Sequence, residues 1–154
     1  MFNPQELLNT TFEDEFSTRL VPVPVNADGW LGVVTKMPEM KTWQARDGSS
    51  SGLKLVITWE LQEPELAQEL GRKVVTLRDE IMLDLTETGM LDKGPGKNVR
   101  LGRLREAQGT NKPGKPWSFS DIVGIPTKVF IKHDVDANDK ETVYERVIGY
   151  TKAA

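Results

Sequence analysis

Alternating hydrophobic and polar positions predict several β-strands in this chain. The clearest lies over residues 53–62, where one face of the strand would carry Leu53, Leu55, Ile57, Trp59 and Leu61. Side chains of a strand alternate between its two faces, so this spacing predicts one face in the core. The same pattern predicts strands over residues 30–46 with a break at Pro38, 73–85, 127–135 and 142–152.

A helical spacing replaces the alternation over residues 99–108. Leu101, Leu104 and Gln108 stand at positions i, i+3 and i+7, which places them on one inward face of a helix. Asn98 is a plausible N-cap, and Gly109 ends the pattern. Shorter helical turns are predicted over residues 4–8, 64–70 and 117–123, the last with Ser118 or Ser120 as its cap.

The first 25 residues differ from the rest of the chain. Pro22 and Pro24 in LVPVPV each lack a backbone N–H, so this segment is expected to be extended edge or polyproline chain rather than a central strand. A chain of 154 residues falls in the usual size range of one domain. We therefore expect an N-terminal arm over 1–25, partly extended, and a single domain over 26–154.

The order of the predicted elements is three strands, a helix and two strands. A five-stranded OB barrel, a Greek-key barrel that binds oligonucleotides or oligosaccharides, has this order, with the helix between its third and fourth strands. We therefore expect a mainly β protein with an OB-like barrel and one helix. An α+β sheet with one covering helix has the same order and is the alternative.

Composition excludes several classes of protein. The chain has no Cys, which excludes disulfides, thiolate metal sites and Cys nucleophiles. No segment approaches the roughly 18 apolar residues that a membrane span needs, and the N-terminus lacks the basic and apolar regions of a signal peptide. We expect a protein that is neither secreted nor inserted in a membrane.

Positive charge gathers in one stretch of an acidic chain. The net charge is −3, with five basic and eleven acidic side chains in residues 1–70 against fifteen and twelve in residues 71–154. Residues 93–116 alone hold seven Lys or Arg and a single acid, Glu106. Gly stands near Lys in both loops of this stretch, which lets backbone and ammonium approach a phosphate together. A surface helix also needs charge for solvation, so a solvated face is the simpler explanation.

If the stretch binds a polyanion, its cations would contact phosphates and nearby indoles would stack on bases. The candidates for phosphate contact are Lys97, Arg100, Arg103, Arg105, Lys112 and Lys115. The candidates for stacking are Trp43, in a polar strand beside a flexible turn, and Trp117, directly after the basic loop. Aromatic platforms with cations favour sequence-tolerant binding of single strands. For Trp117, a ring that covers the edge of the core is the simpler alternative.

Signals for chemistry are fragmentary. His133 is the only imidazole, and its neighbours Asp134 and Asp136 are more typical of a strand end than of a metal site. The segment GPGKN lacks the spacing and the hydroxyl of a nucleotide-binding loop. No nucleophile and base can be paired, so we expect a protein that is not an enzyme, with no catalytic residue, no metal site and no cofactor.

Several phrases resemble a group of small phage proteins. They are SGLKLVITWELQ, GRKVVTLRDEIMLDL, GKNVRLGRLREAQG and VYERVIGY. The likeness extends over about residues 28–151 and is to proteins of phage replication or recombination modules, some of them OB-fold single-stranded DNA-binding proteins. The resemblance implies binding of single-stranded DNA without strong sequence preference. The chain ends in YTKAA, whereas many such proteins end in an acidic tail that recruits partners.

We therefore expect a sequence-nonspecific single-stranded DNA-binding protein of a phage replication or recombination module. Its partners would be single-stranded DNA and proteins of that module, and its location the cytoplasm of the infected bacterial host. A homo-oligomer is compatible with the sequence, and no membrane partner is expected. The alternative function is a small virion structural or assembly protein, whose arm and VPVPV segment would serve exchange between subunits.

Overall fold

The computed structural model describes residues 3–154 and contains every strand and helix predicted above. The strands are β1 (Trp30–Val34), β2 (Glu39–Gln44), β3 (Ser51–Leu61), β4 (Thr76–Met82), β5 (Thr127–Val135) and β6 (Val143–Lys152). The helices are α1 (Pro4–Leu8), α2 (Pro64–Leu70), α3 (Val99–Ala107) and the single 3-10 turn η1 (Phe119–Ile122). The predicted strand over 30–46 is thus two strands on either side of Pro38.

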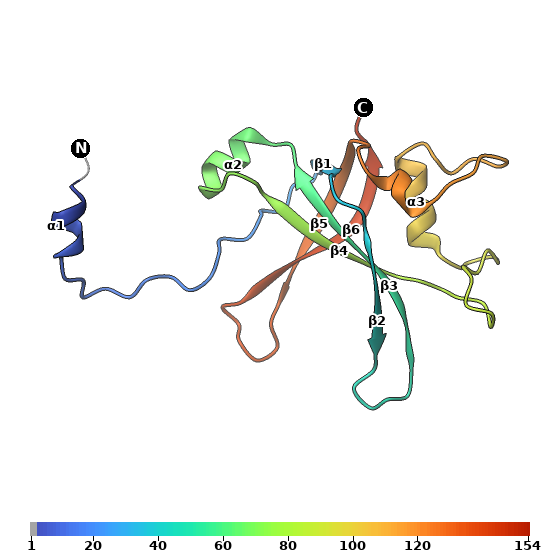
Figure 1. Ribbon diagram of the computed structural model, residues 1–154, viewed down its shortest axis with the longest axis horizontal. Helices are drawn as coiled ribbons and strands as arrows, with labels where there is room; N and C mark the ends of the chain where they lie inside the picture. Colours follow the sequence, from blue (N-terminus) through green and yellow to red (C-terminus); the bar gives the residue numbers. More distant parts are fainter. Residues whose placement is uncertain (1–2) are drawn as a thin grey trace.

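The strands form one antiparallel sheet (Figure 1). β1 and β2 pair with successive parts of one edge of β3, and β4 pairs with its other edge. β1 also pairs with β5, which pairs with β6. The first long, bent strand therefore links the β3–β4 pair to the β5–β6 pair.

The two ends of this strand arrangement, β4 and β6, run parallel and lie side by side. Within residues 3–154, no backbone ladder joins them, so the sheet is open at this seam and the predicted closure of the barrel is not confirmed. α3 packs beside β6 near the seam. The coarser prediction, a mainly β fold with a helix between the strands now labelled β4 and β5, is confirmed.

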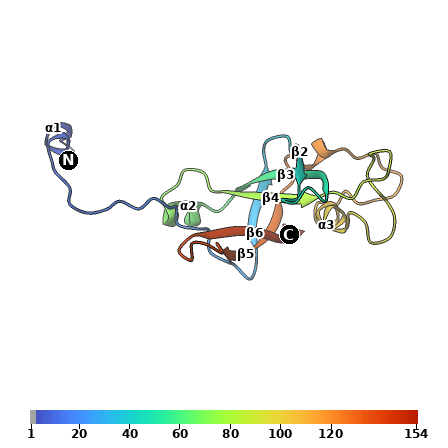
Figure 2. The same ribbon diagram turned by 90° about the horizontal axis from the view of Figure 1, so that it is seen from below.

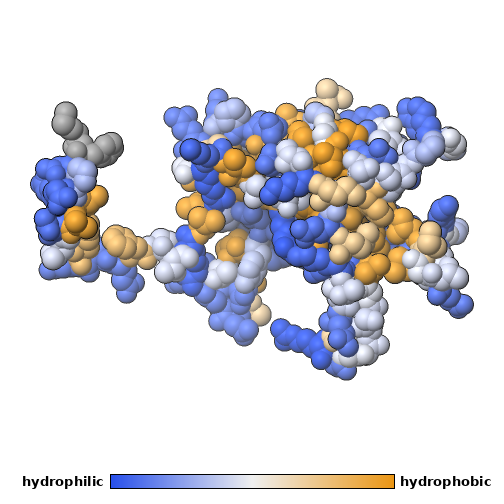
Figure 3. Space-filling model, in the orientation of Figure 1, coloured by the Kyte–Doolittle hydropathy of each residue, from blue (hydrophilic) through white to orange (hydrophobic). Residues whose placement is uncertain are grey.

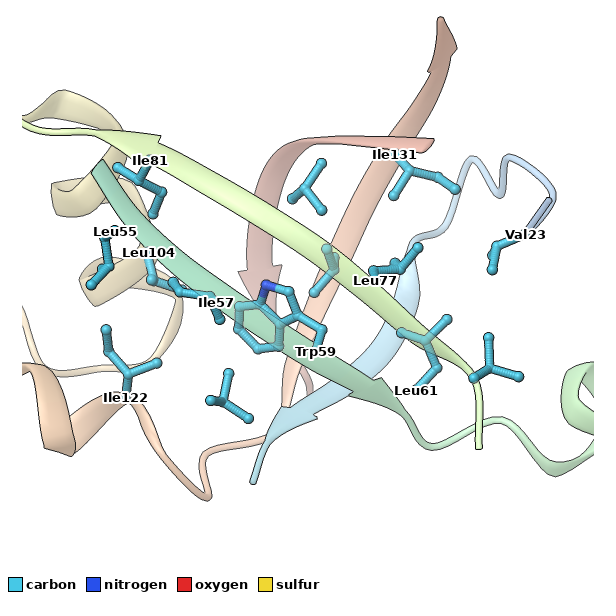
Figure 4. Packing of buried hydrophobic residues seen from close by; sticks show 14 of the residues in the cluster. Val23, Leu55, Ile57, Trp59, Leu61, Leu77, Ile81, Leu104, Ile122 and Ile131 are labelled. Atoms are coloured by element: carbon cyan, nitrogen blue, oxygen red, sulfur yellow. The ribbon is translucent and has the colours of Figure 1, made fainter. Parts of the chain in front are cut away.

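The core lies between the inner face of the sheet and α3 (Figure 4). Of the inward positions predicted for β3, Leu53 is partly buried and the other four are buried, Trp59 fully so. Leu101 and Leu104 of α3 reach the same cluster, together with Ile122 of η1. Burying large apolar side chains is the main stabilising contribution to folding, so the alternation in the sequence determines which face of each strand packs.

The N-terminal arm leaves the body of the protein at one end of its longest axis (Figures 1 and 2). Each residue from position 3 to 21 is exposed. The arm is anchored where Arg19 pairs with Asp139 and where the backbone N–H of Val23 donates to the Glu145 carboxylate. Val23 itself is fully buried in the core, so the last part of the predicted arm packs with the body. None of the described helices is long and apolar enough to cross a membrane.

Candidate nucleic-acid interface

The basic stretch forms α3 and the two loops that flank it, at the end of the body opposite the arm (Figure 1). Leu101 and Leu104 fix the helix against the core. At its C-terminal end, the buried side chain of Gln108 donates to the carbonyl of Ile122 and lies 3.3 Å from the hydroxyl of Thr127. The predicted inward face is confirmed, and the side-chain nitrogen at its polar end forms hydrogen bonds with η1 and β5.

Asn98 organises the loop before α3 rather than capping the helix through its side chain. Its backbone is left-handed, with φ of 50°. Its side-chain amide donates to the carbonyls of Asp84 and Asp92, at 2.8 and 2.9 Å, and its Oδ1 accepts from the N–H of Asp84. Asn98 thus occupies the predicted N-cap position, but its side chain does not cap the helix, because these loop groups use the whole amide.

Five cations project from the helix and its loops into solvent. We call them the cationic surface, which consists of Lys93, Lys97, Arg103, Lys112 and Lys115. In the described part of the chain, none of the five forms an ion pair with a carboxylate. Their charges are therefore available to an external anion.

Arg100 points toward the sheet instead. Its guanidinium donates at 2.6 Å to the carboxylate of Asp79 in β4 and at 2.6 Å to the carbonyl of Val147 in β6. The side chain is 35% exposed, whereas that of Asp79 is fully buried. Arg100 is one of the predicted phosphate contacts, but the buried carboxylate draws its guanidinium toward the sheet, whereas Arg103 is exposed.

Asp79 is the centre of a buried polar cluster that bridges the open seam. In addition to Arg100, the indole N–H of Trp59 donates to the Asp79 carboxylate at 3.1 Å. The hydroxyl of Tyr150 in β6 also donates to this carboxylate. Burial raises the pKa of Asp79, while the Arg100 guanidinium opposes this rise. Burial, followed by the charge of Asp79, also raises the pKa of the Tyr150 hydroxyl. Side chains thus connect β4 to β6 where backbone hydrogen bonds do not.

The sequence contained a signal for this cluster. Asp79 alternates in step with Leu77 and Ile81, at an inward position of its strand. A charged residue at such a position needs a buried partner, because an unpaired charge is expensive to bury.

Arg105 lies on the other flank of α3 and packs on Trp117. Its guanidinium is 4.5 Å from the centre of the indole and donates to the carbonyl of Thr110 at 2.7 Å. Trp117 in turn contacts Phe119 edge to face, with the ring centres 5.2 Å apart. Both side chains are half-buried, so the expected contribution of Trp117 to the edge of the core and its place beside a cation are both observed.

Trp43 lies on the outer face of the sheet, apart from α3. Its cross-strand partner is Gly52, and the indole rests where a side chain at that position would be. Beside it the surface is hollowed by about 390 Å³, lined by Thr42, Trp43, Gln44 and Ser51. The loop after β4 begins nearby, where the N–H of Leu83 donates to the carbonyl of Leu53. A half-buried ring beside a shallow hollow is a suitable platform for one base.

Gly52→Ala is expected to displace the Trp43 indole without unfolding the protein. An ideal Cβ at position 52 would lie 2.9 Å from the indole nitrogen, which is closer than real Cβ contacts. The side chain of Trp43 has room to turn into the neighbouring hollow. Tryptophan emission and near-ultraviolet circular dichroism should change while the melting temperature stays close to that of the wild type. Unchanged spectra would contradict this geometry.

Two cations on the outer face of the sheet, the face that carries Trp43, are neutralised within the protein. Lys54 and Arg78 both pair with Glu80, and this contact with Lys54 lowers the pKa of the Glu80 carboxyl most. A groove of about 900 Å³ along the seam is lined by five arginines and five acids, and its Arg146 pairs with Asp134. The groove therefore presents mixed charge, in contrast to the cationic surface.

The eight residues predicted to contact DNA thus occupy different positions. Lys97, Arg103, Lys112 and Lys115 are exposed around α3, and Arg105 stacks on Trp117 beside them. Arg100 is held by Asp79, and Trp43 is at the β2–β3 hairpin.

Comparison of the chain with models of protein families, with curated proteins and with solved structures finds no match.

Proposed function

We propose that this chain is an OB-like protein that binds single-stranded DNA without sequence preference. The arrangement of strands supports the OB interpretation. A bent first strand pairs with both β3 and β5, the parallel strands β4 and β6 face each other, and α3 stands between β4 and β5 in the chain. In this proposal the side-chain cluster around Asp79 takes the place of the closing ladder of a barrel.

The observation that carries the DNA-binding proposal is the cationic surface. Five exposed Lys or Arg, which form no ion pair within residues 3–154, stand on a chain whose net charge is −3. Such a concentration of one sign on an otherwise acidic protein attracts a polyanion locally. Each phosphate that is neutralised releases counterions, which makes the binding strongly dependent on salt.

The exposed side chains of this region determine the contacts that we propose with DNA. Lys97, Arg103, Lys112 and Lys115, with Lys93 beside them, would bind phosphates. Trp43 and the Arg105–Trp117 pair would provide stacking surfaces for bases. Arg100 is left out of this set, because its ion pair with Asp79 gives it a structural role. Backbone contact with stacking gives affinity without sequence readout.

Titration of the intrinsic tryptophan fluorescence with oligo-dT tests the proposal. At about 50 mM salt we expect quenching, and the logarithm of the association constant should fall with the logarithm of salt with a slope of about −3.5, since each of the five phosphate contacts contributes about −0.7 for single strands. A duplex of the same length should bind more weakly, because its bases are not available for stacking. Absence of quenching at low salt, or an affinity independent of salt, would refute DNA binding.

The resemblance of the sequence to phage proteins suggests the setting. We infer a phage replication or recombination module, other proteins of that module as partners, and the cytoplasm of the infected bacterial host as the location. The proposed protein has a binding role and performs no catalysis.

The exposed arm favours a second candidate, a small virion or assembly protein. An arm that leaves the body suits exchange between subunits, and residues 3–21 are exposed. The oligo-dT titration separates the two candidates, since a purely structural protein has no reason to show salt-dependent quenching. Electron microscopy of large, regular assemblies formed without DNA would favour the structural role.

A further inference from the structure

The first part of the arm, residues 3–18, makes no hydrogen bond to the body in the part of the chain that the structure describes. We call this segment the acidic arm, because it holds four acids, Glu6, Glu13, Asp14 and Glu15, and no Lys or Arg. Its own contacts are local, and its longer-range anchor begins only at Arg19. Within residues 3–154, no cation forms an ion pair with these four acids.

The acidic arm also exposes large apolar side chains. Leu7, Leu8, Phe12 and Phe16 are 59–75% exposed, and the two Phe rings touch each other edge to face at 5.7 Å. Figure 3 shows apolar side chains uncovered along the arm. A contiguous segment of this kind is typical of a surface that another molecule covers.

The body offers a complementary surface at its opposite end. The cationic surface carries five positive charges, and two exposed apolar side chains belong to the same region: Met90 in the loop before α3 and Val99 at the start of the helix. Acids with Leu and Phe on one element thus match cations with Met and Val on the other. Complementary charge of this kind guides association and discriminates among partners.

The arm of the same molecule is poorly placed for this contact. Figures 1 and 2 show α1 at one end of the longest axis and α3 toward the other. Arg19, the buried Val23 and the bond from Arg72 to the carbonyl of Val21 fix the direction in which the arm leaves the body. To reach its own α3, the arm would have to reverse at this anchor and cross the sheet.

We propose that the acidic arm of one molecule docks on the cationic surface of a second copy of this chain. Phe12 and Phe16 cover Met90 and Val99, and the carboxylates that flank the Phe residues pair with the lysines. Because the acidic arm and the cationic surface lie at opposite ends of the molecule, the contact is head-to-tail and adds one copy after another. The mass should then rise with protein concentration and fall with salt.

Size-exclusion chromatography with light scattering of the full chain, freed of nucleic acid, tests this at low salt. Two variants each remove one side of the contact. The arm variant carries Glu13→Gln, Asp14→Asn and Glu15→Gln. The surface variant carries Lys112→Glu and Lys115→Glu on the cationic surface. Each is expected to be monomeric alone. Mixed together, they should form a complex that stops at one copy of each. The intact arm of the surface variant binds the intact cationic surface of the arm variant, and no second pair of intact surfaces remains.

A control with Glu65→Gln and Glu69→Gln changes two exposed acids of α2 and should associate like the wild type. A wild-type chain that stays monomeric at every concentration would overturn the proposal. So would variants that associate as the wild type does, or a mixture that stays monomeric. The measurement contains no DNA, so its failure and the failure of the proposed DNA binding are separate results.

Discussion

Replacing Arg100 with Met is expected to destabilise the protein by about 3 kcal/mol at neutral pH, as is typical when one partner of a buried ion pair is removed. The variant leaves the carboxylate of Asp79, which is fully buried, without its counter-charge. Met keeps most of the apolar stem of Arg100, so little packing is lost. Urea unfolding followed by tryptophan fluorescence measures the change.

The pH dependence of this loss identifies its cause. Burial raises the pKa of Asp79 above its ordinary value, so the native state binds this proton more tightly than the unfolded state does. The contribution of Asp79 to the free energy of unfolding is therefore greatest at low pH. It falls as the pH rises from the pKa of this carboxyl in the unfolded state through its raised pKa in the native state. Without Arg100 the pKa should rise further, and the penalty should shrink on acidification as Asp79 takes up a proton.

Two further variants complete the test of Arg100. Arg103→Met removes an exposed cation of the same helix and should change stability by less than about 0.5 kcal/mol. Asp79→Leu together with Arg100→Met should be clearly less harmful than Arg100→Met alone, because no buried charge is left. Equal losses for Arg100→Met and Arg103→Met would show that the ion pair across the seam contributes nothing.

The strands and helices were predictable because local pattern determines them. The alternation in residues 53–62 gave the buried face of β3, and the spacing of Leu101, Leu104 and Gln108 gave that of α3. The open seam was not predictable, since hydrogen bonding between β4 and β6 depends on how the whole sheet curves. Alternation identifies the face of a strand and says nothing about its second neighbour.

The candidate site was predictable in composition and not in detail. Spacing placed Arg100 and Arg103 on neighbouring positions of one helix, and only the position of Asp79 in a distant strand separates the bound arginine from the free one. The packing of Trp43 on Gly52 likewise depends on the register of β2 against β3. The position of a side chain that contacts residues far away in the sequence can be predicted only from the tertiary structure.

Neutralising four members of the cationic surface should weaken DNA binding more than any single substitution. The variant replaces Lys97, Arg103, Lys112 and Lys115 with Gln. Because each phosphate contact contributes about −0.7 to the salt slope for single strands, removing four should flatten the slope by about 3. At low salt the affinity for oligo-dT is expected to fall by at least about a hundredfold, since the backbone supplies most nonspecific affinity. The readout is the fluorescence titration described above.

A matched control decides whether position or total charge causes this loss. Gln at four other exposed lysines that form no ion pair in the described chain, namely Lys36, Lys73, Lys140 and Lys152, makes the net charge of −3 more negative by the same four units. If DNA binds along the cationic surface, this control keeps most of the affinity and nearly the full salt slope. If the two variants lose affinity equally, DNA responds to overall charge, and the cationic surface has no special role. Both variants change only exposed side chains, so equal melting temperatures would exclude unfolding as the cause.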